Sequence, residues 1–365
     1  VLATGDKKGL HHEMVNGIKV YRGGIKNIYW TYGNREHSRI KKLLWHIKDM
    51  YNAGMKDYVR EVIALEKPDI VSCHNIAGWS VAVWDEINRA KIPTVQVLHD
   101  FYFLCTKSTL FKNDSRCDKR CFECKLMRIL HRQKSKNINA VVGVCRDVVD
   151  RVVNAGYFTN SLKTAIHNVR IIPDTGKKHQ QTETDNPVFG FIGSLIPSKG
   201  ILWLIEQFQK VNSKNISLKI AGKGESNYEN QLKNISKNDT RISFLGYTKS
   251  EDFYPSVDVL VIPSIWHEPL ASVAIEACAR HIPVITSATG GLKEIIIDGY
   301  NGLHCDISSP DSLSDAISKI IADKDLLNEL RKNARESVRS FLDTDRLTSE
   351  YEDVYKKVIK RDFIK

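Results

Sequence analysis

The sequence predicts an α/β protein made of two doubly wound domains, and three observations lead to this prediction. The chain has 365 residues, which is more than one hydrophobic core usually serves, so two cores are expected. Short apolar runs alternate with helical patterns in both halves of the chain, as in βαβ units. Residues 174–187 contain no apolar residue and cannot contribute to a core, so they are predicted to link the two domains.

The first predicted domain, residues 1–173, contains the elements of a parallel sheet. Val1–Gly5 has the pattern of a strand that leads directly into a loop. Further strands are expected over residues 69–72, 93–98 and 140–144, with helices over 79–90 and 146–155. The last of these helices should end at Gly156, because glycine is the usual residue just past a helix C-terminus. This order of elements predicts a parallel, doubly wound sheet.

The second predicted domain, residues 188–343, repeats the alternation. Strands are expected over residues 188–192, 218–221, 242–245, 257–262 and 283–286, with helices between most of them. The remaining segment, 344–365, is predicted to be a C-terminal helix. An N-cap near 343–345 can begin this helix, whose regular part should cover 346–359.

The composition is that of a globular protein with an anionic partner. Hydrophobic residues make up 42% and charged residues 27% of the chain, and no apolar run approaches the ~18 residues that span a bilayer. The net charge of +11 favours nucleic acid, an anionic lipid surface or a phosphorylated small molecule, and charge alone does not choose among them. Eight unevenly placed cysteines, together with no resemblance to a secretory signal peptide, predict a reducing, cytoplasmic location.

The loop Gly193–Gly200 is the first candidate ligand site, because ligands of open α/β sheets bind at loops that follow strands. Its sequence, GSLIPSKG, leaves a strand and opens a helix. It therefore offers backbone N–H groups and the ammonium group of Lys199 to a phosphate. An ordinary turn with a solvated lysine would explain the same pattern.

The stretch Pro263–Ala277 is more informative, because it carries two carboxylates between a strand and a helix. Glu268 leaves the strand and is kept out of the α region by Pro269, and Glu276 is expected about two turns into the helix. Ionised carboxylates accept hydrogen bonds from vicinal hydroxyls, and free N–H groups near Leu270–Ser272 favour a diphosphate. A sugar nucleotide presents hydroxyls, diphosphate and ribose hydroxyls in this order. The alternative makes Glu276 a solvated helix residue and Glu268 a capping carboxylate.

The surrounding motifs favour the ligand-binding interpretation. The E-x7-E pattern is followed by Thr289–Ile295, TGGLKEI, and by Asp298–Leu303, DGYNGL, and this combination resembles glycosyltransferase family 4. The resemblance covers nearly the whole chain and includes Gly222–Glu225 and Phe244–Tyr247. It implies the GT-B fold, in which two Rossmann-like domains face a central cleft and the C-terminal helix crosses back to the first domain. It also implies a nucleotide-sugar donor, retention of anomeric configuration and catalysis without a metal.

The resemblance further implies roles for individual residues. Glu268 would contact the hydroxyls of the donor sugar, Glu276 the ribose, and Lys199 would neutralise the leaving diphosphate. His99 follows the strand at 93–98 and would contact the donor sugar, whereas a lone histidine is usually structural. We therefore expect catalytic roles for His99, Lys199 and Glu268. The expected donor-binding residues are Gly193, Ser194, Lys199, Gly222, Lys223, Glu268, Pro269, Leu270, Ala271, Ser272 and Glu276.

Two features depart from the pattern of the family. Ser194 stands where the family often has arginine, so one phosphate-stabilising cation is missing or is replaced from elsewhere. The family usually begins with a strand and a glycine-rich loop that approaches the donor phosphates, and neither precedes Val1. We therefore expect an upstream segment in the native chain, and donor binding is better supported than catalytic strength.

Four cysteines that lie close together form a candidate metal site: Cys105, Cys117, Cys121 and Cys124. Their spacing suits a tetrahedral structural zinc or, less well, an iron–sulfur cluster that staples a polar loop. Four free thiols are an equal alternative, because the C-x2-C half lacks a matching partner half. No cofactor is expected to be required for catalysis.

The helix-like stretch 123–137 combines basic and apolar residues. The basic residues are Lys125, Arg128, Arg132, Lys134 and Lys136, and the apolar residues are Leu126, Met127, Ile129 and Leu130. Such a helix can rest on an anionic membrane, here the inner face of the plasma membrane. A solvated helix face packed on its own domain is at least as good an interpretation.

Together with these residues, the resemblance implies a retaining hexosyltransferase. It would move a sugar from a nucleotide diphosphate sugar to a glycan or lipid-linked acceptor in bacterial surface polysaccharide assembly. The alternative, motivated by Ser194 and by the expected upstream segment, is a non-catalytic subunit that binds the nucleotide sugar. Nucleic acid is not an expected partner, because the basic residues are dispersed and no groove-reading or single-strand motif occurs. The base, sugar, acceptor and linkage are not readable, since specificity lies in pocket shape.

Overall fold

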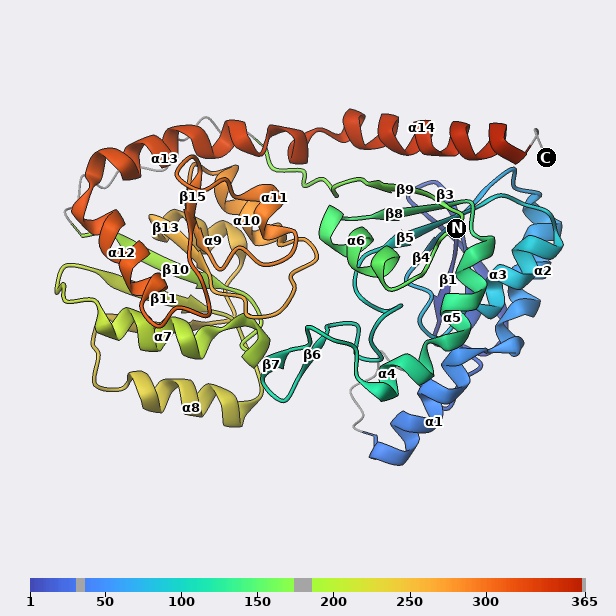
Figure 1. Cartoon of the computed structure of the whole chain (residues 1–365), viewed down its shortest axis with the longest axis horizontal. Helices are drawn as coiled ribbons and strands as arrows, with labels where there is room; N and C mark the ends of the chain where they lie inside the picture. The colour runs from blue at the N-terminus through green and yellow to red at the C-terminus, as the bar shows by residue number, and fades with distance from the viewer. Residues whose placement is uncertain (31–36, 174–185, 363–365) are drawn as a thin grey trace. The chain divides into compact units, whose positions relative to one another are not determined.

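The computed structural model describes residues 1–30, 37–173 and 186–362 of the chain (Figure 1). The chain forms two compact units. Unit 1 comprises Val1–Leu110, Asp118–Ile166 and Ser349–Lys365, and unit 2 comprises Phe111–Cys117 and His167–Thr348. Of the predicted linker 174–187, residues 174–185 lie outside the described part of the chain.

Unit 1 contains a four-stranded parallel sheet in the order β4-β5-β8-β9. Its strands are β4 (Val71–His74), β5 (Thr94–Leu98), β8 (Ala140–Gly143) and β9 (Leu162–Ala165). Every residue of the two central strands, β5 and β8, is buried, as expected for a parallel sheet covered on both faces. Helix α3 (Ala82–Arg89) joins β4 to β5, and α6 (Arg146–Asn154) joins β8 to β9. These connections confirm the predicted βαβ order.

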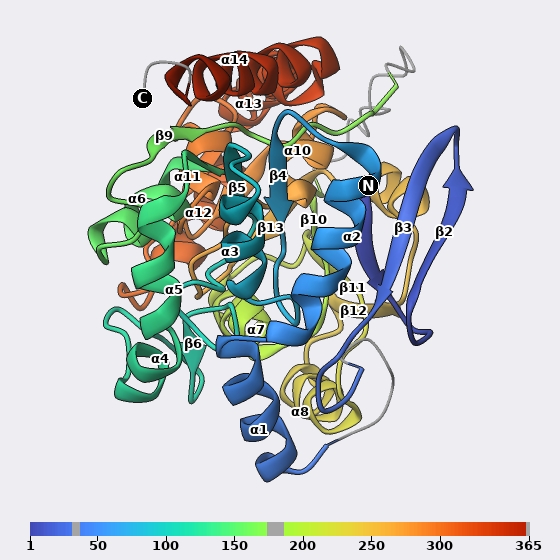
Figure 2. The same cartoon turned by 90° about the vertical axis from the view of Figure 1, so that its right-hand side faces the viewer.

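A second sheet of unit 1 has the order β1-β3-β2 (Figure 2). The strand expected at residues 1–5 is present as β1 (Leu2–Gly5), and β2 (Leu10–Val15) and β3 (Ile18–Gly24) form a hairpin. The hairpin turn consists of Asn16 and Gly17, whose φ angles are 50° and 77°. Two successive residues with positive φ make a type I′ turn, for which Asn-Gly is a preferred pair. The sequence therefore contained a signal for this hairpin that the prediction did not use.

The segment expected as one helix over 123–137 is two short helices, so this prediction is wrong. α4 (Phe122–Met127) and α5 (Ile129–Lys134) are separated at Arg128. The side chain of Arg128 is fully buried, and its Nη1 lies 3.3 Å from Oδ2 of Asp49, which is also buried. A buried guanidinium needs such a partner, and this requirement accounts for the inward position of Arg128.

The basic residues of this segment therefore do not share one solvated face. Lys134 is partly buried and its Nζ lies 2.9 Å from Oδ1 of Asp85. Lys125, Arg132 and Lys136 are exposed. Among the apolar residues, Met127 is buried, whereas Leu126 and Ile129 are exposed.

The helices of unit 1 before β4 were not assigned from the sequence. α1 (Arg39–Met50) and α2 (Lys56–Glu66) are separated by a short 3₁₀ turn (Ala53–Met55). Ser38 caps α1, because its Oγ accepts a hydrogen bond from the amide of Lys41 at 3.4 Å. Trp45 and Asp49 are the buried residues of α1. The helix therefore attaches to unit 1 by one face.

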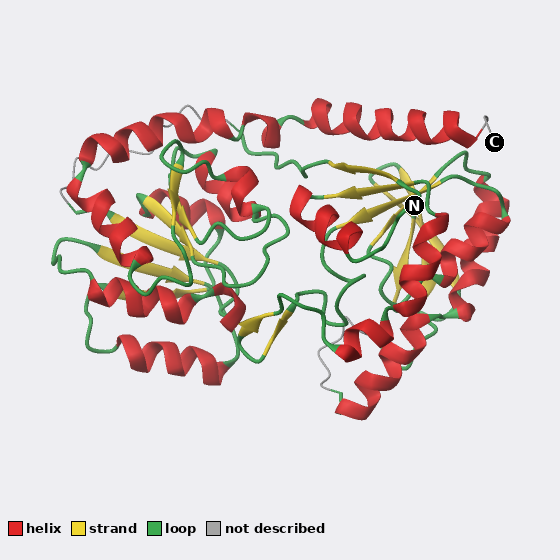
Figure 3. Cartoon of the chain, viewed as in Figure 1, coloured by secondary structure: helices red, strands yellow, loops and turns green. Residues whose placement is uncertain are grey.

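Unit 2 contains a six-stranded parallel sheet in the order β12-β11-β10-β13-β14-β15 (Figure 3). The strands are β10 (Val188–Ile192), β11 (Ser217–Ala221), β12 (Ile242–Gly246), β13 (Val259–Ile262), β14 (Val284–Thr286) and β15 (Gly302–His304). The five predicted strands are present, and β15 is an addition. The chain adds β11 and β12 on one side of β10 and then β13, β14 and β15 on the other. This is the doubly wound order, with its topological switch point between β10 and β13.

Two hydrophobic clusters pack against the unit 2 sheet. Successive residues of β13 alternate between them, because side chains along a strand point to opposite faces. Val259 and Val261 belong to the cluster that contains α7 (Ile201–Lys210) and α12 (Ser312–Ala322). Leu260 and Ile262 belong to the cluster that contains α10 (Ser272–Cys278). The other helices are α8 (Ser226–Ser236), α9 (Ser250–Phe253), α11 (Leu292–Ile295) and α13 (Lys324–Ser337).

The C-terminal helix, α14 (Thr344–Asp362), belongs to both units. Its start is capped by Asp343, whose Oδ1 accepts a hydrogen bond from the amide of Arg346 at 3.0 Å. The N-cap expected near 343–345 is therefore confirmed. From Ser349 onward the helix groups with unit 1, which confirms the predicted return of the chain to its first domain. No helix within the described residues is both long and apolar enough to cross a membrane.

Candidate functional site

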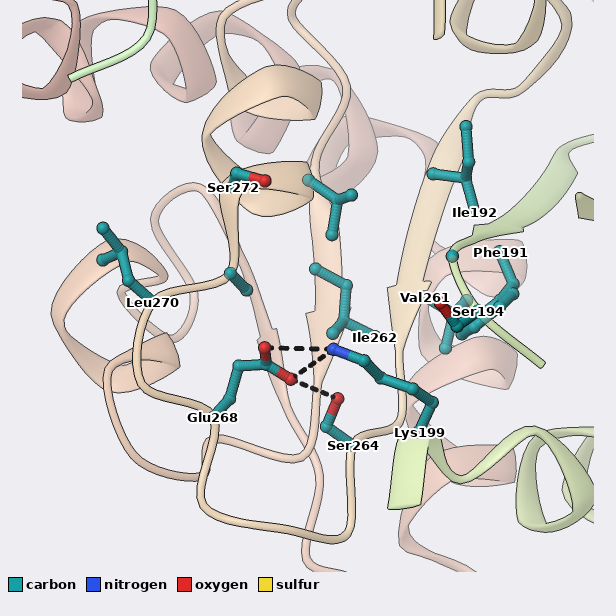
Figure 4. Close-up of a pocket in the computed structure, with 13 residues that line it drawn as sticks. Phe191, Ile192, Ser194, Lys199, Val261, Ile262, Ser264, Glu268, Leu270 and Ser272 are labelled. Atoms are coloured by element: carbon teal, nitrogen blue, oxygen red, sulfur yellow. Dashed lines mark hydrogen bonds and ion pairs between the residues drawn. The ribbon is translucent and has the colours of Figure 1, made fainter. Parts of the chain in front are cut away.

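The switch point of the unit 2 sheet holds a cavity of about 240 Å³ (Figure 4). Its walls come from the ends of β10 and β13, from the loops that follow them and from the start of α10. Doubly wound sheets bind ligands at this place, outside the carboxyl ends of the strands. The lining residues are Phe191, Ile192, Gly193, Ser194, Lys199, Val261, Ile262, Ser264, Glu268, Leu270, Ala271, Ser272 and Val273.

Most of the predicted donor-binding residues meet at this cavity. Those that line it are Gly193, Ser194, Lys199, Glu268, Leu270, Ala271 and Ser272. The predicted residues outside the lining are Gly222, Lys223, Pro269 and Glu276. Ser264 also lines the cavity, although no role was predicted for it.

The carboxylate of Glu268 is the most densely bonded group of the cavity. Lys199 Nζ lies 3.0 Å from Oε1 and 2.8 Å from Oε2 of Glu268, whose side chain is only 7% exposed. Ser264 Oγ and Trp266 Nε1 donate to Oε2 at 3.1 Å and 2.8 Å. Figure 4 shows the Lys199 and Ser264 side chains converging on Glu268.

Lys199 reaches Glu268, which is 69 positions away, through close backbone packing of two loops. Gly200 has a φ of 72°, and a Cβ atom at this position would lie 1.9 Å from the carbonyl oxygen of Pro263. The amide of Ile265 donates to the carbonyl of Ser198 at 3.0 Å. Glycine is therefore required beside Lys199, because any side chain would push the two loops apart.

The Gly290-Gly291 turn fixes the backbone of Glu268. The amide of Gly291 donates to the carbonyl oxygen of Glu268 at 2.8 Å. Gly290 has a φ of 57°, and a Cβ atom there would lie 2.2 Å from the same oxygen. Thr289 Oγ1 and Ser287 Oγ donate to the carbonyl of Ser264 at 3.3 Å and 2.5 Å. The motif thus positions the carboxylate loop.

A second glycine contact joins the loops after β10 and β11. A Cβ atom at Gly222 would lie 1.8 Å from the carbonyl oxygen of Gly193. The amide of Leu195 donates to the carbonyl of Lys223 at 2.9 Å. Lys223 is exposed and lies in the loop that contacts the one containing Ser194. Gly222 and Lys223 therefore support the wall of the cavity from outside its lining.

Glu276 lies one turn into α10 rather than two, because the helix begins only at Ser272. Its Oε2 accepts hydrogen bonds from Tyr254 Oη at 3.2 Å and from Ser250 Oγ at 3.4 Å. Arg170 Nε lies 3.6 Å from Oε1. The interpretation of Glu276 as a simple solvated helix residue is wrong, since its carboxylate is 17% exposed and has three partners.

The start of α10 contributes backbone donors to the cavity. Ala271 is the N-cap residue, and Leu270, Ala271 and Ser272 line the cavity. The first amides of a helix have no acceptor within the helix, and they favour negative charge. This wall of the cavity is therefore suited to an anionic group.

In unit 1, His99 has a partner that the sequence did not reveal. Nε2 of His99 lies 2.9 Å from Nδ1 of His74, and Nε2 of His74 lies 3.2 Å from Ser72 Oγ. His74 ends β4 and His99 follows β5, and these two parallel strands are neighbours. Partial burial lowers the pKa of both imidazoles, that of His74 to about 4, with a further contribution from His99. The two rings thus form an uncharged pair at neutral pH.

The four cysteines of the candidate metal site are divided between the units. Cys117 belongs to unit 2, and Cys105, Cys121 and Cys124 belong to unit 1. A hydrogen bond from Cys124, supported by amides of the loop 107–110, lowers the pKa of Cys105 to about 6 against the effect of burial. A thiolate is the form of cysteine that binds zinc, but the same hydrogen bond raises the pKa of Cys124, so only one member of this pair favours the thiolate. Within the described residues, however, no group of three or more His, Cys, Asp or Glu is arranged to hold a metal ion, and the zinc site stays a prediction.

The fold and the cavity define an α/β protein with a ligand site at the switch point of its second sheet. Residues 1–167 match the family model of the glycosyl transferase 4-like domain, and residues 174–337 match that of glycosyl transferases group 1. The chain therefore belongs to the glycosyltransferases that combine these two domains, as its motifs suggested.

Relatives in sequence and structure agree with this family. An uncharacterized 42.6 kDa protein in the cps region of Klebsiella pneumoniae is 30% identical over 294 residues, which are 80% of this chain and 75% of that protein. A capsular polysaccharide biosynthesis glycosyltransferase of Staphylococcus aureus is 26% identical and covers 50% of each chain. The Anabaena HepE structure in complex with UDP and glucose superposes with a TM-score of 0.65 at 19% identity, over 82% of both chains. This likeness confirms the predicted GT-B fold.

Proposed function

We propose that the chain is a retaining hexosyltransferase that uses a nucleotide diphosphate sugar as donor. The observation that carries the proposal is the Lys199–Glu268 pair in the switch-point cavity. An anionic acceptor for hydroxyls and an ammonium group lie side by side there, next to the start of a helix. A nucleotide diphosphate sugar carries the complementary groups, namely vicinal hydroxyls and a diphosphate.

In this proposal the donor occupies the cavity with its sugar at Glu268. The amides of Leu270–Ser272 and the ammonium group of Lys199 bind the diphosphate. Glu276 receives the ribose hydroxyls, and Tyr254 and Ser250 hold its carboxylate in place through their hydrogen bonds.

The proposed chemistry needs no nucleophile from the protein. Lys199, Ser264 and Trp266 already donate to Oε2 of Glu268, which disfavours attack by this carboxylate on carbon. Oε1 receives only Lys199, so it keeps an acceptor position for a sugar hydroxyl. The bond from the anomeric carbon to the diphosphate breaks while the acceptor oxygen bonds to the same face of that carbon. The acceptor proton passes to the leaving phosphate oxygen, and Lys199 stabilises the negative charge that develops there.

The names of relatives support the choice of acceptor. The Staphylococcus aureus relative acts in capsular polysaccharide biosynthesis, and a Salmonella typhimurium relative is a lipopolysaccharide 1,2-N-acetylglucosaminetransferase. We therefore propose a glycan or lipid-linked acceptor in surface polysaccharide assembly. The corresponding location is the cytoplasm, with peripheral contact at the inner face of the plasma membrane.

A non-catalytic subunit that binds the nucleotide sugar is the second candidate, and Ser194 favours it. This uncharged side chain lines the cavity at a position where the family often has arginine. The two candidates differ in one observable. A binding subunit would retain nucleotide affinity without releasing nucleotide from the donor.

We propose no metal for catalysis and keep a structural zinc at the cysteine loop as a separate proposal. Metal analysis of protein purified without added metal tests it. One zinc per chain would support the site. If the protein contains no zinc and no iron, the proposal is wrong.

The catalytic proposal is tested by nucleotide release from a panel of nucleotide sugars with the variant Lys199→Ala. We expect a loss of about 10²–10³ in turnover, the usual cost of removing one group that stabilises a developing oxyanion. Lys210→Ala is the matched control, because Lys210 is an exposed lysine of the same unit that pairs with Asp311. Nuclear magnetic resonance of the product should show the anomeric configuration of the donor, and an inverted product would contradict retention.

A further inference from the structure

Helix α1 of unit 1 carries an exposed apolar stripe that the proposed donor chemistry does not use. Ile40, Leu43, Leu44 and Ile47 are spaced i, i+3, i+4 and i+7, so they share one face of the helix. Their exposures are 71%, 45%, 46% and 47%. Soluble surfaces rarely gather large apolar side chains in this way without a partner.

The stripe lies opposite the face by which α1 attaches to unit 1. Trp45 and Asp49 are buried, and at 100° per residue the centre of this pair lies about 170° from the centre of the stripe. Asp49 accepts hydrogen bonds from the amide of Gly78 at 2.6 Å and from Tyr102 Oη at 2.8 Å. The helix is thus attached to unit 1 by one face, and the stripe lies on the opposite face, which is exposed to solvent.

Helix α4 lies beside α1 and carries two further exposed apolar residues. It contacts α1, and its residues Phe122 and Leu126 are 81% and 50% exposed. We call the six exposed residues of the two helices the α1–α4 surface: Ile40, Leu43, Leu44, Ile47, Phe122 and Leu126. Figure 1 shows the two helices close together, in agreement with their contact.

The charges on α1 beside the stripe have one sign, and α4 adds one exposed acidic residue, Glu123, and one exposed lysine, Lys125. The basic residues of α1, which are Arg39, Lys41, Lys42 and Lys48, are all exposed. The sole acidic residue of α1 is Asp49, which is buried. Lys41 and Lys48 lie within about 110° of the stripe on one side, and Arg39 lies on the other. An apolar face flanked by cations is the pattern of a helix that lies in the interface of an anionic bilayer.

We propose that the α1–α4 surface docks unit 1 onto an anionic lipid bilayer. The apolar side chains would enter the boundary between headgroups and acyl chains, while the flanking lysines contact lipid phosphates. The inference extends the proposed function, whose lipid-linked acceptor lies in such a membrane, and it moves the contact from the predicted 123–137 helix to α1.

The test measures co-sedimentation of the whole chain with vesicles of phosphatidylcholine alone or mixed with phosphatidylglycerol. We expect binding to the mixed vesicles that weakens at high salt. The variant Leu43→Ser/Leu44→Ser/Ile47→Ser should lose at least about a hundredfold in partition, because it removes apolar area that would be buried. The matched control is Met14→Ser/Ile18→Ser/Leu65→Ser, three exposed apolar residues of the same unit outside this surface, which should bind as the wild type does.

A second variant keeps the proposal testable if the stripe variant fails to fold. Lys41→Gln/Lys48→Gln removes no apolar group and should weaken binding to the mixed vesicles about tenfold or more. Equal binding by all variants, or no vesicle binding by the wild type, would overturn the proposal. The proposal would also be overturned if the wild type were a dimer and the stripe substitutions dissociated the dimer without changing vesicle binding. Thermal shifts with nucleotide sugars, measured on the same variants, report donor binding separately, so the docking and the proposed function can each fail alone.

Discussion

Each unit places a pair of polar side chains at the carboxyl ends of two neighbouring strands, β4 and β5 in unit 1 and β10 and β13 in unit 2. The two pairs differ in charge. In unit 2 Lys199 and Glu268 carry opposite charges, and further donors hold the carboxylate. In unit 1 His74 and His99 are two imidazoles whose pKa values are lowered, so the pair is uncharged at neutral pH. The difference teaches that unit 2 offers charged groups, which suit a ligand with both anionic groups and hydroxyls. Unit 1 instead offers groups that can donate or accept a hydrogen bond without net charge.

The largest expected effect comes from removing the fixed charge of unit 2. Glu268→Gln keeps the shape of the side chain but leaves Lys199 without its anionic partner. We expect kcat/KM to fall about 10²–10³-fold, because the hydroxyl acceptor and the position of the lysine are lost together. The comparison variant Glu276→Gln lies outside the cavity lining and should mainly raise KM. Equal losses in kcat for both variants would contradict the separate roles.

The next effect concerns the backbone that holds the unit 2 pair. Gly290→Ala introduces a Cβ atom that would lie 2.2 Å from the carbonyl oxygen of Glu268, at a φ of 57°. We expect the free energy of unfolding in urea to fall by about 2–4 kcal/mol. Gly299→Ala is the matched control, since its φ is 71° and nothing lies within 4 Å of the added Cβ. If both variants lose the same free energy of unfolding, the positive φ alone explains the loss, and the close contact with Glu268 contributes nothing to it.

The smallest effect is expected at the unit 1 pair and depends on pH. The pKa of His74 is lowered in the folded protein to about 4, so the unfolded chain takes up the proton first as the pH falls. The free energy of unfolding should therefore decrease between about pH 6.5 and pH 4, by about 1 kcal/mol or less because part of the ring reaches solvent. His74→Gln should flatten this part of the pH profile, and the substitution His12→Gln in the exposed strand β2 should not. An unchanged slope in His74→Gln would show that the pair does not titrate as proposed.

The sequence was sufficient for the fold and for most of the unit 2 cavity, because their signals are local. The apolar alternation predicted the strands of both main sheets except β9 and β15, and the stretch 263–277 contains Glu268 and the start of α10 in one run. The Gly290-Gly291 motif was recognised, although its physical task, close contact with the backbone of Glu268, became visible only in three dimensions.

The features that the sequence did not reveal depend on long-range contacts. His74 meets His99, 25 positions away, because β4 and β5 are adjacent, and strand order is not written in the apolar pattern. The expected 123–137 helix breaks because Arg128 pairs with Asp49, 79 positions earlier. The stripe of α1 was not predicted, because no helix was assigned there and only the burial of Trp45 and Asp49 shows which face of the helix is the outer one.

The most direct test of the central claim is a thermal-shift panel of nucleotide sugars on the wild type and on Lys199→Ala and Glu268→Gln. A donor that binds the folded protein raises its melting temperature through mass action. We predict that one nucleotide sugar raises the melting temperature of the wild type by several degrees, and that both variants respond much less at the same concentration. No response of the wild type to any nucleotide sugar, or equal responses in all three proteins, would contradict donor binding at the Lys199–Glu268 pair.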